Sequence, residues 1–168
     1  MGALTDFFIA TPEDVNDLRT GQLLRDLFPT LEMKNVDSMK LEILAQIVTG
    51  NSQELELEEL LRSRFLVLVK GSLGGEFRLP DEFNEGDPMD FDLWIERFDP
   101  AFVEGLATFP AEQVLPAATQ WAEQWAAFDG RAVGKDDAVS LAALMQQLCQ
   151  LATRARAEGK QLYLQTCL

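Results

Sequence analysis

Carboxylates are the reactive side chains that this sequence offers in quantity. The chain has 28 Asp and Glu, 14 Lys and Arg and no His among its 168 residues, so its net charge is near −14. The absence of His excludes Ser-His-Asp and Cys-His catalysis, and it excludes His-ligated metal sites. An enzyme built on this chain would depend on Asp, Glu, Lys, Tyr or Cys.

The carboxylates are most concentrated between residues 76 and 99, where nine acids accompany only Arg78 and Arg97. A solvated acidic surface is the simplest interpretation of this segment, and a docking surface for a basic protein is the functional one. The spacing does not match a calcium loop, because counting from Asp81 places Phe83 and Glu85 where an EF-hand requires Asp or Asn. We therefore predict no metal site. The candidate partner-binding residues are Asp81, Glu82, Glu85, Asp87, Asp90, Asp92 and Trp94.

Trp94 stands out among the aromatic residues because acids flank it. An exposed Trp in an irregular segment can anchor a protein partner. Two of the neighbouring carboxylates could instead perform general acid–base chemistry, which would require burial or a neighbouring charge to raise the pKa of one of them. The sequence identifies no such pair, so it predicts no catalytic residue.

A glycine-rich stretch follows the most apolar run in the first half of the chain. Residues 65–69 read FLVLV, which predicts a strand buried on both faces, and we take this strand as the centre of the fold. Gly71, Gly74 and Gly75 come next, as at the start of many phosphate-binding loops. However, Lys70 precedes the glycines and Pro80 soon follows them, so the spacing predicts a hairpin and no nucleotide or other cofactor.

Composition also bears on location and partners. The net charge near −14 disfavours binding to nucleic acid or to an anionic membrane. No apolar run reaches the length of a membrane span. Cys149 and Cys167 match no metal-binding or redox motif, and no secretory leader is evident, so we expect two free thiols in a cytoplasmic protein.

The elements that must position these residues predict one α+β domain over residues 1–168. The expected sheet is small and mostly antiparallel, with strands near 6–10, 65–70, 76–79 and 162–167 and a weak strand at best over 31–36. About six to eight helices pack with it. Helix starts are expected at Thr11-Pro12, Asp37, Asp90, Asp99-Pro100 and Asp136 or Asp137, with a further helix over 53–64 and stops at Gly50 and Gly159.

Two aromatic stripes and one leucine seam have helical spacing. Trp121, Trp125 and Phe128 form one stripe, and the second predicts a short helix beginning at Asp90 that carries Phe91, Trp94, Ile95 and Phe98. We expect both stripes to lie in the core. The seam from Leu141 to Leu151 is expected to be an internal core helix, with a homodimer interface as the alternative.

The order of parts resembles the YfbM-like family of bacterial proteins of unknown function. The resemblance rests on an early aromatic strand, on Val36-Asp37 opening a helix that ends in Val48-Thr49-Gly50, on the stretch FDPAFVEGLA at 98–107, and on a long helix before a last strand. It implies a bacterial α+β protein. It implies no catalytic or binding residue.

We therefore expect a non-catalytic cytosolic protein, regulatory or immunity-like, that presents an acidic face to a basic partner. One alternative is a carboxylate-dependent hydrolase, which a metal could assist. Another is a structural homodimer through the last helix. The protein itself would be a monomer or a homodimer.

Overall fold

The fold is α+β, as the sequence predicts, and it is built on an antiparallel sheet. The computed structural model describes residues 4–18, 24–34, 36, 38–50, 67–70, 77–78 and 93–167. Within these ranges six strands pair in the order β2-β1-β6-β5-β3-β4, and every neighbouring pair is antiparallel. The strands are β1 (Leu4–Ala10), β2 (Thr30–Lys34), β3 (Val67–Lys70), β4 (Phe77–Arg78), β5 (Leu93–Arg97) and β6 (Gln161–Cys167).

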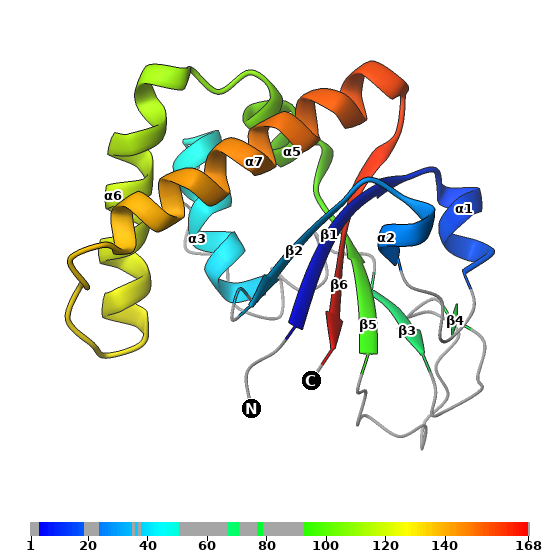
Figure 1. Ribbon diagram of the computed structural model, residues 1–168, viewed down its shortest axis with the longest axis horizontal. Helices are drawn as coiled ribbons and strands as arrows, with labels where there is room; N and C mark the ends of the chain where they lie inside the picture. Colours follow the sequence, from blue (N-terminus) through cyan, green and yellow to red (C-terminus); the bar gives the residue numbers. More distant parts are fainter. Residues whose placement is uncertain are drawn as a thin grey trace.

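Helices cover both faces of this sheet (Figure 1). On one face lie α3, α5, α6 and α7, which pack against one another, and on the other lie α1 and α2. Their bounds are α1 (Pro12–Asn16), α2 (Leu24–Leu27), α3 (Ser38–Thr49), α5 (Pro100–Ala107), α6 (Val114–Phe128) and α7 (Asp137–Glu158), with a 3-10 turn, η2 (Ala111–Gln113), before α6. None of the described helices is both long enough and apolar enough to cross a membrane.

The centre of the sheet is β6, which pairs with β1 on one side and with β5 on the other. Four consecutive residues of β1, Phe7 to Ala10, are 0% exposed, and Leu162 to Leu164 of β6 are also buried. Such runs are typical of strands that are covered on both faces. The prediction that residues 65–69 form the centre is wrong, because β3 lies next to the edge strand β4.

Alternate residues of the central strands enter two separate cores. Phe7, Ile9, Leu162 and Leu164 face the larger core, which is completed by α3, α5, α6 and α7. Phe8, Ala10 and Tyr163 face the smaller core under α1 and α2. The Phe8 ring stacks on both Phe28 and Tyr163, with centroids 5.4 Å apart in each pair.

Two parts of the sheet differ from the prediction. The helix expected at residues 90–98 does not form over its described part, because Leu93–Arg97 is strand β5 and pairs with both β3 and β6. Helical spacing suggested Phe91, Trp94 and Phe98 as one face, but Ile95 is buried in the smaller core while Phe98 lies in the larger one. The weak strand expected near 31–36 is a full member of the sheet, β2.

Other local predictions are confirmed. Thr11 and Asp14 form a capping box at α1, in which Thr11 Oγ1 accepts from the Asp14 amide at 3.1 Å and Asp14 Oδ2 accepts from the Thr11 amide at 2.9 Å. Asp99 Oδ1 caps α5 by accepting from the Ala101 amide at 2.6 Å. Gly159 ends α7 in the left-handed conformation, with φ of 64°. The strand pairing of β3 with β4 confirms the predicted return of the chain after the glycines.

The leucine seam of α7 is internal, as predicted. Leu141, Leu144 and Leu148 are buried in the larger core, where α7 packs on α6 and α5. The stripe on α6 is only partly internal. Trp121 is fully buried and donates from Nε1 to the Lys40 carbonyl at 2.8 Å, whereas Phe128 at the end of the helix is 57% exposed.

Phe8 and Phe128 allow one substitution to be compared in two environments. Phe8→Ala should lower the free energy of unfolding by about 3–5 kcal/mol, because it leaves a cavity beside Phe28 and Tyr163. Phe128→Ala should change it by no more than about 0.5 kcal/mol. Urea unfolding followed by circular dichroism measures both. Similar losses at the two positions would show that this assignment of the core is incorrect.

Candidate functional site

The predicted acidic segment connects the edge strand β4 to the interior strand β5. Asp81, Glu82, Glu85, Asp87, Asp90 and Asp92 lie outside the described residues, but the two ends of the segment are placed. Arg78 is opposite Val69 at its start, and Leu93 is opposite Cys167 at its end. The sheet therefore fixes both points from which the segment departs. The glycine loop at 71–75 and the helix expected over 53–64 also lie outside the described part of the chain.

Trp94 belongs to β5 and not to a helix or an irregular segment. Its backbone lies between Val69 of β3 and Thr166 of β6. The side chain of Trp94 is outside the described part. The backbone pairing on both sides holds this position firmly, two residues after the last carboxylate of the segment.

Two acids that the sequence groups with this segment have other roles. Glu96 is only 5% exposed, so it contributes no charge to an outer surface. Asp99 caps α5. Because Glu96 is opposite Leu164, which enters the larger core, the strand carries this carboxylate toward the helix-covered face. Glu96 and Asp99 are therefore not part of the docking surface proposed from sequence.

Buried polar residues gather on that same face, and sequence reasoning missed them. Thr5 and Thr166 are directly opposite each other on β1 and β6, and both are buried. Thr5 Oγ1 donates to the Val36 carbonyl at 2.8 Å, which fixes the chain just before α3. Within the described part of the chain, Thr166 Oγ1 makes no hydrogen bond. Thr5 is two residues from Phe7, and Thr166 is two residues from Leu164. Because residues two apart in a strand share a face, this spacing was the signal in the sequence that places both hydroxyls inside.

A buried carboxylate also occurs on α3. Glu42 is 5% exposed, and its Oε1 accepts from Gln46 Nε2 at 3.5 Å, one helical turn further along. Neither Glu42 nor Glu96 is recognisable from the local sequence pattern, because their burial depends on the elements that cover them. Buried carboxylates of this kind occur at functional sites and also in structural networks.

The ionisable groups elsewhere show no activated nucleophile among the described side chains. Burial raises the pKa of the Cys149 thiol, which disfavours its thiolate form. Burial also raises the pKa of the Tyr163 hydroxyl. The described ranges contain no group of three or more side chains suited to hold a metal ion. The side chain of Cys167 lies outside them.

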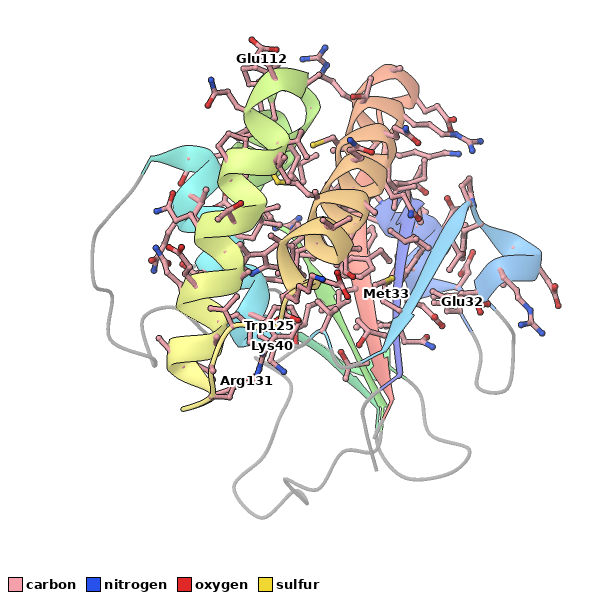
Figure 2. The ribbon with its side chains drawn as sticks, turned by 60° about the vertical axis from the view of Figure 1, so that its left-hand side comes forward. Glu32, Met33, Lys40, Glu112, Trp125 and Arg131 are labelled. Carbon is pink, nitrogen blue, oxygen red and sulfur yellow. The ribbon has the colours of Figure 1, made fainter. Side chains whose placement is uncertain are left out.

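A cluster of polar contacts lies at the turn between α6 and α7. Trp125 Nε1 donates to Asp129 Oδ2 at 2.7 Å, and Arg131 Nη1 lies 2.6 Å from Asp137 Oδ2. Lys40 Nζ sits 4.7 Å from the centre of the Trp125 ring, and Figure 2 shows Lys40, Trp125 and Arg131 together at this end of α6. These contacts join α3, α6 and the start of α7. Their geometry accounts for a rigid turn without requiring a ligand.

No family model, curated protein or solved structure matches this chain. The resemblance in arrangement to the YfbM-like family therefore stays a prediction.

Thr5 and Thr166 predict opposite responses to the same substitution. Thr5→Val leaves the Val36 carbonyl without its donor, so it should lower the free energy of unfolding by about 1–2 kcal/mol. Thr166→Val removes a buried hydroxyl that makes no hydrogen bond in the described structure, so stability should stay the same or rise by up to about 1 kcal/mol. Denaturant titration of both variants provides the measurement. Equal losses would contradict the hydrogen-bond assignments, because the two positions face each other in one sheet.

Asp137 predicts a dependence of stability on pH. The hydrogen bonds from Arg131 and from the Gly134 amide hold the pKa of this carboxyl below its ordinary value of 3.8. The charged form is therefore favoured in the folded protein, and the resulting stabilisation is present above the ordinary pKa and is lost as pH falls through the lowered one. Asp137→Asn should lower the melting temperature at about pH 7, and the difference from the parent protein should shrink toward about pH 3.

The neighbouring Asp136 supplies the control for this experiment. Its side chain makes no capping hydrogen bond to α7. Asp136→Asn should therefore leave the melting temperature nearly unchanged across the same pH range. If Asp137→Asn proved equally silent at neutral pH, its link to Arg131 would contribute nothing to stability.

Proposed function

We propose that this protein is a non-catalytic, cytosolic protein of regulatory or immunity-like type that binds a basic protein partner through the acidic segment at residues 81–92. The observation that carries the proposal is the charge of this segment, which has six carboxylates and no Lys or Arg in twelve residues. A net charge near −14 for the whole chain adds a long-range attraction for cationic partners. Charge of this kind raises the association rate and discriminates against acidic partners.

The placement of the segment in the fold supports this proposal. Both of its ends leave from paired strands, Arg78 in β4 and Leu93 in β5. A recognition segment that is tied to a rigid sheet at both ends loses less conformational entropy on binding than a free tail of equal length. Functional segments commonly occupy such positions on a scaffold.

Trp94 is the candidate apolar anchor of this surface. It lies two residues after Asp92, in a strand that pairs on both sides. Aromatic residues at the centre of charged surfaces often contribute much of the binding energy. In this proposal the carboxylates steer the partner and Trp94 fixes its position.

The experiment is affinity capture from an extract of the cells that make the protein, at about 50 mM and about 500 mM salt. The captured protein, identified by mass spectrometry, is then purified and its affinity measured by calorimetry. The triple substitution Asp87→Asn, Asp90→Asn and Asp92→Asn should weaken the affinity by about tenfold or more, because it removes three charges from the contact. High salt should weaken the parent complex strongly and the triple variant less.

A matched variant controls for net charge. Glu112→Gln, Glu123→Gln and Asp136→Asn remove the same number of charges from exposed positions on η2, α6 and the end of the turn before α7. This variant should retain the parent affinity within about twofold, because charges far from the contact are screened. If both triple variants bound the partner equally well, or if capture were the same at low and high salt, the acidic segment would not be the binding surface.

A further inference from the structure

The strand β2 lies at one edge of the sheet, at the opposite end from β4. Among the described strands, only β1 pairs with it. An edge strand carries a row of backbone N–H and C=O groups that can pair with another strand, which makes it a natural site for association between chains. The side chains of an edge strand determine which strand can pair with it.

The two faces of β2 differ in character. Leu31 and Met33 are half-buried and pack against the larger core, whereas Glu32 is exposed and lies opposite Asp6. Figure 2 shows Met33 and Glu32 on opposite sides of the strand. Lys34 follows two positions after Glu32 at the end of the strand. In the sequence of the strand, one acid and one base, Glu32 and Lys34, are therefore separated by a single apolar residue.

We propose that two copies of this chain associate by antiparallel pairing of their β2 strands about a two-fold axis at Met33, with Glu32 of each copy opposite Lys34 of the other. Opposite charges in directly opposed positions stabilise an antiparallel pair, and like charges there destabilise it. The register centred on Glu32 would place Glu32 opposite itself. The register centred on Met33 instead forms two equivalent ion pairs, as a two-fold interface requires.

A second observation favours a cation beside Glu32. Asp6 and Glu32 are neighbours across β1 and β2, and Arg25 on α2 is the cation whose Nη1 lies 3.3 Å from Glu32 Oε1. On its other side Asp6 faces the neutral Gln165 of β6. Burial and the charge of Glu32 raise the pKa of Asp6, while Arg25 lowers it. In the proposed dimer, Lys34 of the second copy adds a second cation beside Asp6 and Glu32, where the single chain supplies Arg25.

The pairing would also cover apolar surface. Leu31 and Met33 are partly exposed in the single chain. At the two-fold axis each Met33 would contact its counterpart, and the larger cores of the two copies would lie on the same side of a continuous sheet. This arrangement joins the proteins without using the acidic segment, which enters the sheet at its other edge.

Analytical ultracentrifugation of the full chain from about 10 µM to about 1 mM tests this proposal, since an interface built on one short strand is weak. The parent protein should show a reversible monomer–dimer equilibrium that weakens as salt increases. Glu32→Lys and Lys34→Glu should each raise the dimer dissociation constant by about tenfold or more, because each places like charges opposite each other. The double variant Glu32→Lys with Lys34→Glu should return it to within about threefold of the parent value.

The matched control is Glu112→Lys, which makes the same charge change at an exposed position far from β2 (Figure 2). It should leave the dissociation constant unchanged, and circular dichroism should show that all four variants remain folded. A parent protein that stays monomeric up to about 1 mM would overturn the proposal. Failure of the double variant to restore association would overturn it as well.

A cysteine substitution tests the register itself. Paired residues at a two-fold axis between antiparallel strands have Cα atoms about 4.5–5.5 Å apart, which suits a disulfide. In a chain with Cys149→Ser and Cys167→Ser, Met33→Cys should therefore form a disulfide-linked dimer under mild oxidation, whereas Glu32→Cys should not. Efficient cross-linking by Glu32→Cys alone would place the axis elsewhere and disprove the proposed pairing.

Discussion

The structure depends on the insertion of β6 between β1 and β5. Each of these three strands pairs with a neighbour along both of its edges, so none of them is stable alone. The pairing of β6 with β1 brings Phe7 and Ile9 beside Leu162 and Leu164, and α7 then packs across this surface with its leucine seam. On the other face the same pairing brings Phe8 beside Tyr163 and forms the apolar surface against which α1 and α2 pack. One ladder of backbone hydrogen bonds therefore organises two cores.

Features with a local cause could be predicted from the sequence. A helix that begins at Thr11-Pro12 or Asp99-Pro100 needs only its own side chains and its fixed proline φ, and the spacing of leucines in α7 needs only one apolar neighbour. The strand at β5 could not be predicted in this way. A strand covered on both faces has apolar residues at successive positions. Such a run also fits the spacing of one helix face, as Trp94, Ile95 and Phe98 do. Only the pairing partners β3 and β6, which are distant in sequence, decide between the two.

The same limitation applies to the site. The carboxylates at 81–92 are evident from composition, but composition also includes Glu96, which the pleat of β5 turns toward the interior. Burial of Glu42, Thr5 and Thr166 likewise depends on which elements cover them and not on their neighbours in the chain. The fold thus separates charges that the sequence presents as one group. The strands that flank the acidic segment, β4 and β5, lie on the opposite side of β6 from the edge strand β2.

The central position of β6 has a consequence for how the chain is made in the cell. Of the described elements, β6 is the last to leave the ribosome, yet β1, one of its two neighbours, is the first. Until residues 161–167 emerge, Phe7 to Ala10 have no partner strand on the side that β6 occupies in the folded protein. Contacts of such long sequence separation slow folding and prolong exposure to aggregation. A stalled or truncated nascent chain that lacks this last strand would therefore be a target for quality control, even if every helix before it had already formed.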